Sequence, residues 1–320
     1  MALAVTSIGE VLIDLTQTGL DEKGIAHFAA NPGGAPANVA VAAARLGAET
    51  AFVGRVGADP FGEALHSVLE GNRVNISGLS QDPLIPTSLA VVTVDARGER
   101  RFSFYRNLGA DMQLTREQIP NRLLEQARIV HFGSVSLTAM PARGAVLDAV
   151  RYAKAQGKLI SYDPNYRAPL WSDPATAKYW MRSPLPLVDI LKVSDEEATM
   201  LADCDDLETA AAALQQQGIR LILITLGARG VYYRFDGRSG TVPGCAVSAA
   251  DTNGAGDTFL GAVLSGLARR PAGLEGLTQP ELEELLRFAN QAAALTTTRS
   301  GAIPAMPSRA EVEACLAHQC

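Results

Sequence analysis

The sequence predicts an α/β fold in which a doubly wound, mostly parallel sheet is flanked by helices and carries a small inserted β lid. Two observations lead to this prediction. Short, nearly continuous apolar runs alternate with longer stretches of helical period, as expected for strands that helices cover on both faces. Two segments, Val11–Asn31 and Thr87–Arg106, instead read as extended or turn-like, and we expect them to form the lid.

The elements of the main sheet are identified by their period. The strands are short apolar runs rich in β-branched residues, and the helices are longer runs with apolar positions on one face. The predicted strands are Ala4–Ile8, Ala51–Val56, Ile129–Phe132, Leu159–Tyr162, Ile190–Val193 and Leu221–Thr225. The predicted helices are Pro36–Leu46, Pro60–Glu70, Pro141–Ala155, Glu197–Leu201, Leu207–Gln217, Ala255–Ala268, Leu282–Thr296 and Ser308–Ala317.

The second inserted segment contains a hairpin pattern. Leu89–Val94 and Arg101–Tyr105 flank the loop Asp95–Gly98, and a glycine in so short a loop is typical of a hairpin. An inserted hairpin does not easily join a parallel sheet, so we expect a small subdomain, either a lid over an active site or an oligomerisation surface. These two roles are compatible. The chain shows no repeat or linker, which favours a single domain over residues 1–320 with a lid from about 11–31 and 87–106.

The composition is that of a globular protein. Hydrophobic residues make up 47% and charged residues 19% of the 320 residues, far from the composition of disordered chains. The net charge of -6 argues against a nucleic-acid or anionic-membrane partner. The N-terminus lacks the basic region of a signal peptide, and no apolar stretch reaches the roughly 18 residues of a membrane helix. The four cysteines show no pairing pattern, so we expect a cytoplasmic protein.

The most informative segment is Asp251–Asp257, which reads Asp-Thr-Asn-Gly-Ala-Gly-Asp and leads into an apolar helix. Glycines at such a junction expose backbone N–H groups at the positive end of the helix dipole, and this arrangement binds phosphate without a lysine. Asp257 is either a simple first-turn acid or a proton acceptor. The pairing of an anion cradle with a carboxylate favours phosphoryl transfer, because the donors stabilise the phosphoryl group while the carboxylate takes the hydroxyl proton.

A second glycine-rich segment precedes the first helix. Gly33 and Gly34 lead into that helix, Pro36 occupies its first turn, and Gly47 is placed to end it. The glycines allow a ligand to approach the backbone. Asn38, one turn into the helix, is either a solvent-facing residue or a ligand contact. The sequence contains no P-loop, no dinucleotide-binding fingerprint and no metal-binding histidine spacing.

Together these two segments resemble the signatures of the ribokinase-like (PfkB) carbohydrate kinases, and the resemblance covers nearly the whole chain. It implies a doubly wound α/β domain with an early β lid, and transfer of a phosphoryl group from ATP with Mg²⁺ to a sugar hydroxyl. It further implies that Asp257 is the catalytic base. The resemblance also implies an anion hole from the backbone of Gly254, Ala255 and Gly256, and sugar contacts from Asp14, Gly33, Gly34 and Asn38.

The resemblance extends to the nucleotide and ion sites. Residues 191–197 are similar to the family's N-x-x-E element near magnesium and phosphate, although Ser194 replaces the usual Asn. The same residues also fit a Ser-capped helix start. The loop Arg299–Ala302 and the backbone near Asp251 and Asn253 correspond to a monovalent-cation site, which makes K⁺ a further expected ion. The residues that the resemblance places beside ATP are Glu197, Thr225, Gly227, Gly230 and Asn290.

The substrate expectation rests on three further patterns, at residues 31–40, 101–106 and 163–171, which look most like those of fructokinases. The third is shared with 2-keto-3-deoxygluconate kinases, in which arginines can meet a carboxylate. Arg106 and Arg167 could therefore contact a sugar hydroxyl, a carboxylate or the ATP phosphates, or each could be a solvated or structural arginine. We expect conversion of D-fructose to fructose 6-phosphate. Aminoimidazole riboside kinases and keto-acid kinases are the alternatives, and a non-catalytic sensor is disfavoured by the intact Asp257. A homodimer through the lid is also expected.

Overall fold

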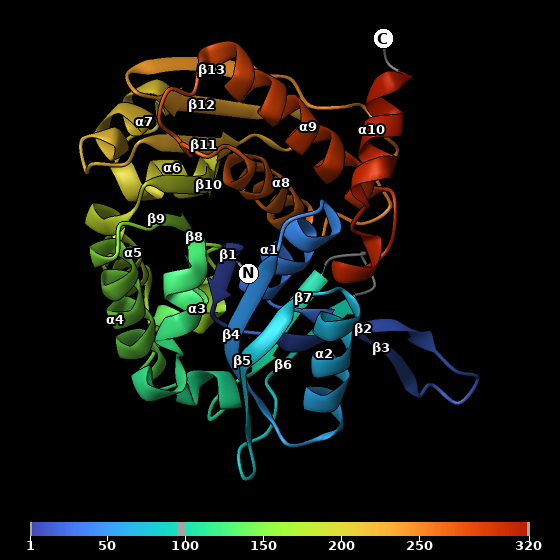
Figure 1. The fold of residues 1–320 in the computed structure, drawn as a ribbon. Coiled ribbons are helices and arrows are strands. Elements are labelled where there is room, and N and C mark those ends of the chain that lie inside the picture. The colour runs from blue at the N-terminus through green and yellow to red at the C-terminus, as the bar shows by residue number, and fades with distance from the viewer. Residues whose placement is uncertain (1, 95–99, 319–320) are drawn as a thin grey trace.

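The computed structural model describes residues 2–94 and 100–318, and these residues form two sheets (Figure 1). The main sheet has nine strands in the order β13-β12-β11-β10-β9-β8-β1-β4-β5, and the second sheet has four in the order β3-β2-β6-β7. The main-sheet strands are β1 (Leu3–Ile8), β4 (Thr50–Gly57), β5 (Asn75–Asp82), β8 (Ala127–Gly133), β9 (Leu159–Asp163), β10 (Ile190–Ser194), β11 (Leu221–Thr225), β12 (Val231–Phe235) and β13 (Arg238–Val242). The second-sheet strands are β2 (Leu12–Leu20), β3 (Ala26–Gly33), β6 (Leu89–Val94) and β7 (Arg100–Tyr105).

The main sheet is mostly parallel. From β5 through β11 every neighbouring pair runs parallel, and only β12 and β13 are antiparallel. The predicted α/β fold with a mostly parallel sheet is thus confirmed. The strands that the sequence pattern missed, β5, β12 and β13, lie at the ends of the sheet. Strands at an edge are covered less completely, so their apolar signal is weaker.

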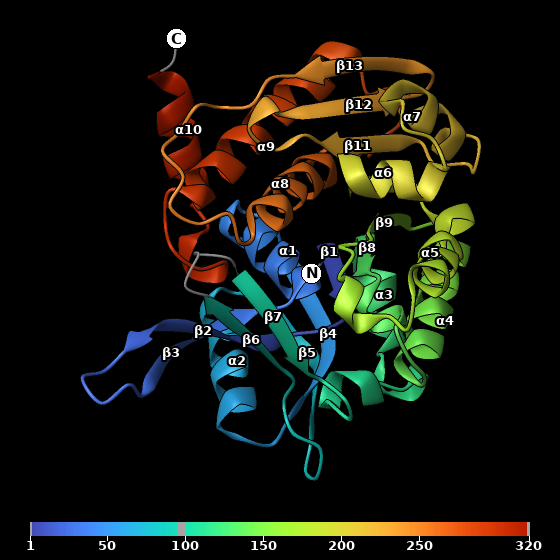
Figure 2. The ribbon, with the colours of Figure 1, turned by 180° about the vertical axis from the view of Figure 1, so that it is seen from behind.

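Helices cover both faces of the main sheet (Figures 1 and 2). The two large apolar clusters lie on opposite faces, and each joins one set of helices to the sheet. One face carries α3 (Asn121–Gln126), α4 (Ala142–Ala155), α5 (Pro174–Arg182), α6 (Asp195–Ala202) and α7 (Leu207–Gln215). The other carries α1 (Ala35–Arg45), α8 (Ala255–Arg269), α9 (Gln279–Thr297) and α10 (Arg309–Ala317), and α2 (Pro60–Gly71) packs with α1 against β4. None of the helices in the described residues is long and apolar enough to cross a membrane.

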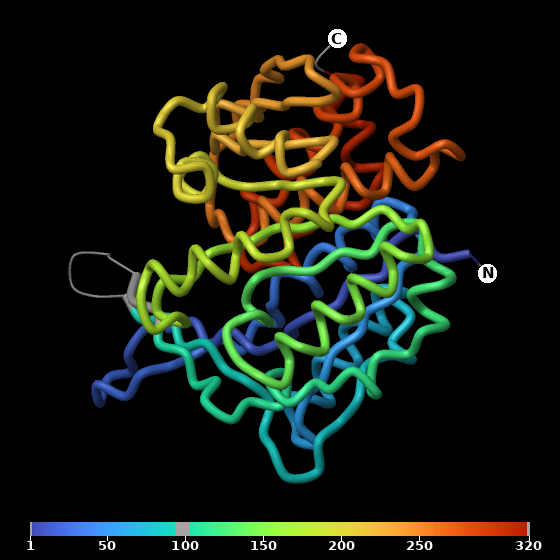
Figure 3. The backbone as a smooth tube through the Cα atoms, turned by 90° about the vertical axis from the view of Figure 1, so that its left-hand side faces the viewer, coloured from blue at the N-terminus to red at the C-terminus, as the bar shows by residue number. Residues whose placement is uncertain are grey.

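The second sheet is built from the two segments expected to form a lid. β2 pairs antiparallel with β3 and parallel with β6, and β6 pairs antiparallel with β7. The predicted hairpin loop Asp95–Gly98 lies outside the described residues. Seen from behind, this sheet stands next to the β1–β4–β5 part of the main sheet (Figure 2), and the arm formed by β2 and β3 projects from the body (Figure 3). Only residues 9–11 separate β1 from β2, so the second sheet starts at the carboxyl edge of the main sheet.

Candidate active site

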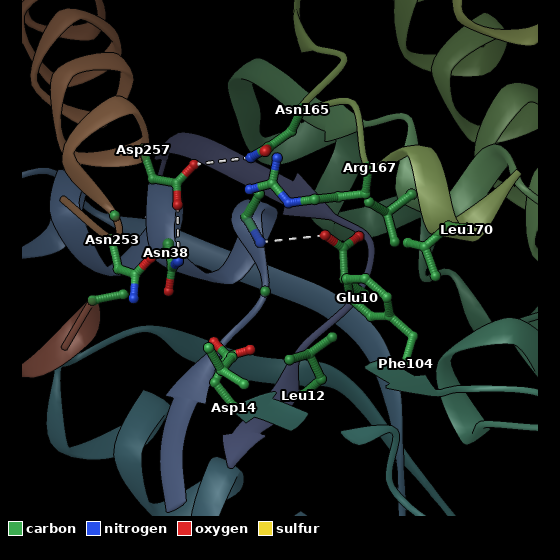
Figure 4. Close-up of a pocket in the computed structure, with 16 residues that line it drawn as sticks. Glu10, Leu12, Asp14, Asn38, Phe104, Asn165, Arg167, Leu170, Asn253 and Asp257 are labelled. Carbon is green, nitrogen blue, oxygen red and sulfur yellow. Dashed lines mark hydrogen bonds between the residues drawn. The ribbon is translucent and has the colours of Figure 1, made fainter. Parts of the chain in front are cut away.

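Parallel strands bring their carboxyl ends to one edge of a sheet, and ligands of open α/β sheets bind at that edge. Here the loops after β1, β8 and β9 meet the first turns of α1 and α8, and a cavity of about 300 Å³ lies between them (Figure 4). Val92 and Phe104 of the second sheet close one side. The lining residues are Glu10, Leu12, Asp14, Gly34, Ala35, Asn38, Val92, Phe104, Val135, Asn165, Arg167, Leu170, Asn253, Gly254, Asp257 and Ala302.

The start of α8 has the backbone that the Gly-Ala-Gly-Asp pattern predicts. Gly254 precedes the helix with φ of 75°, and no side chain caps the helix. A Cβ at Gly254 would lie 2.9 Å from the Cβ of Ala302, so both the left-handed backbone and the close approach require glycine. The uncapped N–H groups of a first turn attract an anion, because they are unpaired donors at the positive end of the helix dipole.

Asp257 lies in that first turn and is nearly buried, with 7% of its surface exposed. Its carboxylate accepts one hydrogen bond from Asn38 Nδ2 at 2.8 Å and another from Asn165 Nδ2 at 3.3 Å (Figure 4). Burial, assisted by the negative charge of Asp163, raises the pKa of Asp257 to about 6. A held carboxylate with a pKa close to neutrality is suited to accept a proton during catalysis.

Three predicted sugar-side residues meet at this cavity. The Asp14 carboxylate faces it from β2 and accepts no hydrogen bond within the described part of the chain (Figure 4). Burial raises the pKa of Asp14 to about 6. Asn38 Oδ1 is buried without a partner among the described residues, which leaves an acceptor for a ligand hydroxyl. Gly34 has a φ of 104°, and its missing side chain admits the backbone carbonyl of Glu10, whereas Gly33 packs beneath Asp14 outside the lining.

Two polar lining residues, Glu10 and Asn165, had no role in the sequence prediction. Glu10 is buried, accepts hydrogen bonds from Ala35 N at 3.2 Å and Ser136 Oγ at 3.4 Å, and has its pKa raised by burial to about 7. Asn165, in the loop after β9, has a φ of 47° and donates a hydrogen bond to Asp257 at the start of α8. Asn165 stood within the pattern at residues 163–171, whereas Glu10 stood in none of the three patterns used for the substrate. Their contacts with the cavity arise from tertiary folding, so residue spacing carried no signal for them.

The two predicted arginines lie in different places. Arg167 lines the cavity, and its Nη1 donates to the backbone carbonyl of Tyr166 at 3.0 Å. Arg106 is buried away from the lining. Its Nε donates to Asp111 Oδ2 at 2.7 Å, and its Nη1 donates to Thr138 Oγ1 at 2.8 Å. In this structure these partners give Arg106 a structural role, in which it anchors the end of β7 to the body.

The residues expected beside ATP lie further along the same sheet edge, outside the cavity lining. The turn after β11 holds Gly227 at a φ of 60° with open space around it, and Thr225 Oγ1 donates to the carbonyl of Val193 at 3.2 Å. Gly230 packs against the segment at residues 242–244, to which Asn290 Nδ2 donates two hydrogen bonds, at 3.2 and 2.9 Å. Asn290 thus holds the segment at residues 242–244, which borders the region expected to bind ATP.

Glu197 has the capping geometry that its sequence pattern also allowed. Its carboxylate accepts hydrogen bonds from the backbone N–H groups of Ser194 at 2.8 Å and Tyr166 at 2.6 Å. It therefore joins the start of α6 to the loop after β9. This arrangement places both oxygens on backbone donors, so Glu197 acts in this structure as a link between two loops of the site.

The two loops expected to hold a monovalent cation are in contact. Asp251 accepts hydrogen bonds from the N–H of Asn253 and the N–H of Gly301, both at 3.1 Å. No group of three or more histidine, cysteine or acidic side chains within the described residues is arranged to hold a metal ion.

Comparison with known proteins gives a consistent result. Residues 2–309 match the family described as pfkB family carbohydrate kinase. The chain is 44% identical over 312 residues to Fructokinase-1 of Oryza sativa subsp. japonica, with 96% of each chain covered. It is similar to the crystal structure of an ATP-bound fructokinase from Xylella fastidiosa, with a TM-score of 0.92, 34% identity and 99% of each chain covered. A double-mutant fructokinase from Vibrio cholerae O395 with bound fructose, ADP and potassium ion gives a TM-score of 0.87 at 32% identity, with 98% of each chain covered.

Proposed function

The chain belongs to the pfkB family of carbohydrate kinases, and we propose that it transfers the γ-phosphoryl group of ATP to D-fructose, giving fructose 6-phosphate. It is a phosphotransferase with a sugar hydroxyl as acceptor. One observation carries the proposal. Asp257, a buried carboxylate with a raised pKa, directly follows an uncapped glycine turn and borders the cavity that Asp14 and Asn38 line.

The geometry supports a direct transfer. With a sugar in the cavity, the Asp257 carboxylate takes the proton of the attacking hydroxyl while the backbone N–H groups of Gly254–Gly256 bind the migrating phosphoryl group. Mg²⁺, held mainly by the ATP phosphates, supplies charge neutralisation when bound. The second sheet acts as a lid: Val92 and Phe104 already lie against the cavity, and its closure excludes water as a competing acceptor.

The charge of the cavity supports a neutral sugar over a sugar acid. Glu10, Asp14 and Asp257 contribute three carboxyl groups to the lining, and Arg167 contributes the one guanidinium among the lining residues described. Arg106, which could have met a substrate carboxylate, is occupied by Asp111. An added negative charge would therefore be placed among like charges, which favours D-fructose over 2-keto-3-deoxygluconate.

The substrate proposal is tested by measuring ADP release with D-fructose, 2-keto-3-deoxygluconate and aminoimidazole riboside. We expect kcat/KM for fructose to exceed that for the keto acid by at least about tenfold, a difference of about 1.4 kcal/mol. A higher kcat/KM for the keto acid would contradict the substrate assignment. Absence of ADP release with every sugar would instead favour a binding protein built on the same fold.

Replacing Asp14 with asparagine should weaken fructose binding. Hydrogen bonds to a charged group contribute about 1.5–3 kcal/mol, so we expect the KM for fructose to rise by about 10-fold or more. The KM for ATP should stay near that of the wild type, because Asp14 lies on the sugar side of Asp257. Steady-state kinetics with each substrate varied in turn separates the two effects. Equal increases in both KM values would remove Asp14 from the sugar site.

For the nucleotide, we place ATP across the turn at Gly227 and the segment at residues 242–244, whose border Asn290 fixes. For the monovalent ion, contact between the Asp251 loop and Gly301 supports a K⁺ site formed by the two loops. The potassium-bound fructokinase from Vibrio cholerae O395 also supports this proposal.

We further propose a homodimer through the lid. Leu20, Ile25 and Phe28 lie on the projecting arm and are 64%, 59% and 42% exposed, an apolar group that a monomer would leave in water. We expect a dimer by light scattering after size exclusion. Leu20→Glu combined with Ile25→Glu should shift the mass to that of the monomer, while a monomeric wild type at micromolar concentration would refute the dimer.

A further inference from the structure

Lys192 is a buried cation within a mostly apolar strand. It lies in the middle of β10, between Leu191 and Val193, and its side chain is 9% exposed. Its Nζ donates to Asp163 Oδ2 at 2.9 Å, and the Asp163 side chain is 2% exposed. Taking two charges out of water costs several kcal/mol per ion, which their attraction repays only with good geometry. Because burial of this ion pair is unfavourable and the pair lies beside the cavity, we considered a functional role for it.

The pair is connected to Asp257 through the loop after β9. Asp163 Oδ1 accepts a hydrogen bond from the backbone N–H of Asn165 at 3.1 Å. Asn165 Nδ2 in turn donates to Asp257 Oδ1 at 3.3 Å. Asp163 therefore holds the loop conformation that presents Asn165 to Asp257.

The Lys192 ammonium also lies against the first turn of α8. A Cβ at Gly256 would be 3.0 Å from Lys192 Nζ, so the absence of a side chain at Gly256 makes room for the cation. The glycine turn thus borders the cavity at Gly254, and the buried positive charge of Lys192 lies next to Gly256. Electrostatic interactions are strong in such a region because water is excluded.

Opposing effects act on the pKa of Asp257. Burial and the charge of Asp163 raise the pKa of Asp257, while Asn38, Lys192 and Arg167 lower it. Asp14 faces Asp257 from the second sheet, and the two carboxylates repel each other. Burial lowers the pKa of Lys192, but Asp163, Glu197 and Asp257 more than compensate and raise it, so Lys192 is cationic at neutral pH.

We propose that Lys192 and Asp163 are positioning residues for phosphoryl transfer: Asp163 holds Asn165 against Asp257, and the Lys192 ammonium keeps Asp257 ionised as a base beside a second buried carboxylate. This inference rests on the proposed kinase function. The two residues touch neither reacting atom and act through Asp257. A purely structural ion pair would hold the same strands together without affecting the proton affinity of the base.

The test compares the pH dependence of kcat/KM for fructose in four variants. Lys192→Met leaves Asp163 uncompensated near Asp257, so the acidic limb should move to higher pH by about 1 unit. Asp163→Asn keeps an acceptor for the Asn165 N–H but removes the negative charge, so the limb should move to lower pH. The double variant should return close to the wild-type limb. Lys154→Met is the matched control, because Lys154 pairs with Asp189 at the other end of β10 and should leave the limb unchanged.

Opposite shifts in the two single variants would support the proposal. Unshifted acidic limbs in active Lys192→Met and Asp163→Asn would overturn it and leave a structural pair. If Lys192→Met does not fold, Asp163→Asn alone tests the proposal, because the proposal requires the acidic limb of its kcat/KM profile to move to lower pH. A wild type that releases no ADP with fructose would refute the proposed function, and an active wild type with unshifted variants would refute only this inference.

Discussion

Replacing Asp257 with asparagine should lower kcat by about 10²–10⁴-fold and leave ATP binding largely intact. In the proposed mechanism this carboxylate takes the hydroxyl proton, and it lies at the start of α8 and at the border of the cavity. Asparagine has almost the same shape but is not a base. It also carries no buried charge, so the fold should persist. We would measure ADP release at saturating fructose and ATP, and ATP binding by calorimetry.

The pH of the measurement matters, because the pKa of Asp257 is raised to about 6. Above pH 6 the wild-type carboxylate is ionised and available as a base, so the difference between wild type and variant is largest there. Below pH 6 the wild type itself becomes protonated and the difference should shrink. Asp148→Asn, on an exposed part of α4, is the control and should keep full activity. Near-wild-type kcat in the Asp257 variant would show that another group accepts the proton.

The features that were predictable from the sequence are those that local chemistry determines. Near-continuous apolar runs such as Leu221–Thr225 require cover on both faces, and they became buried parallel strands. The glycine turn before Asp257 was predictable for the same reason: Gly254 needs a left-handed backbone, and the following residues start a helix. Both patterns span only a few residues, so tertiary contacts did not have to be known.

The rest of the site depends on contacts between distant segments. Asn165 reaches Asp257 across 92 positions, and Lys192 meets Asp163 across 29. No spacing rule links such residues in a single sequence. For Arg106 the sequence left both a substrate contact and a structural role open, and its hydrogen bond to Asp111, five positions later, is visible only in the fold. Residue type indicated the chemistry of each group, and only the fold decided which partner it met.

Replacing Gly254 with valine should lower kcat/KM by at least about 10²-fold, the effect of losing one backbone donor from an anion hole. Valine is strained at a φ of 75°, and its Cβ would lie 2.9 Å from the Cβ of Ala302 and 3.0 Å from its Cα. The turn must therefore move, which takes its N–H groups away from the phosphoryl position. ADP release as a function of ATP concentration measures the loss.

Strain alone could also reduce activity by destabilising the protein, and Gly157 provides the matched control for this effect. It has a φ of 71° after α4, and a Cβ there would meet no atom within 4 Å. A left-handed backbone costs a residue with a side chain about 1–2 kcal/mol, so Gly157→Val should lower Tm without changing kcat/KM. Gly254→Val should lower both. If the two variants lost stability equally and both kept wild-type turnover, the Gly254–Gly256 turn would not be the phosphate cradle, because its displacement would have had no effect on the transfer.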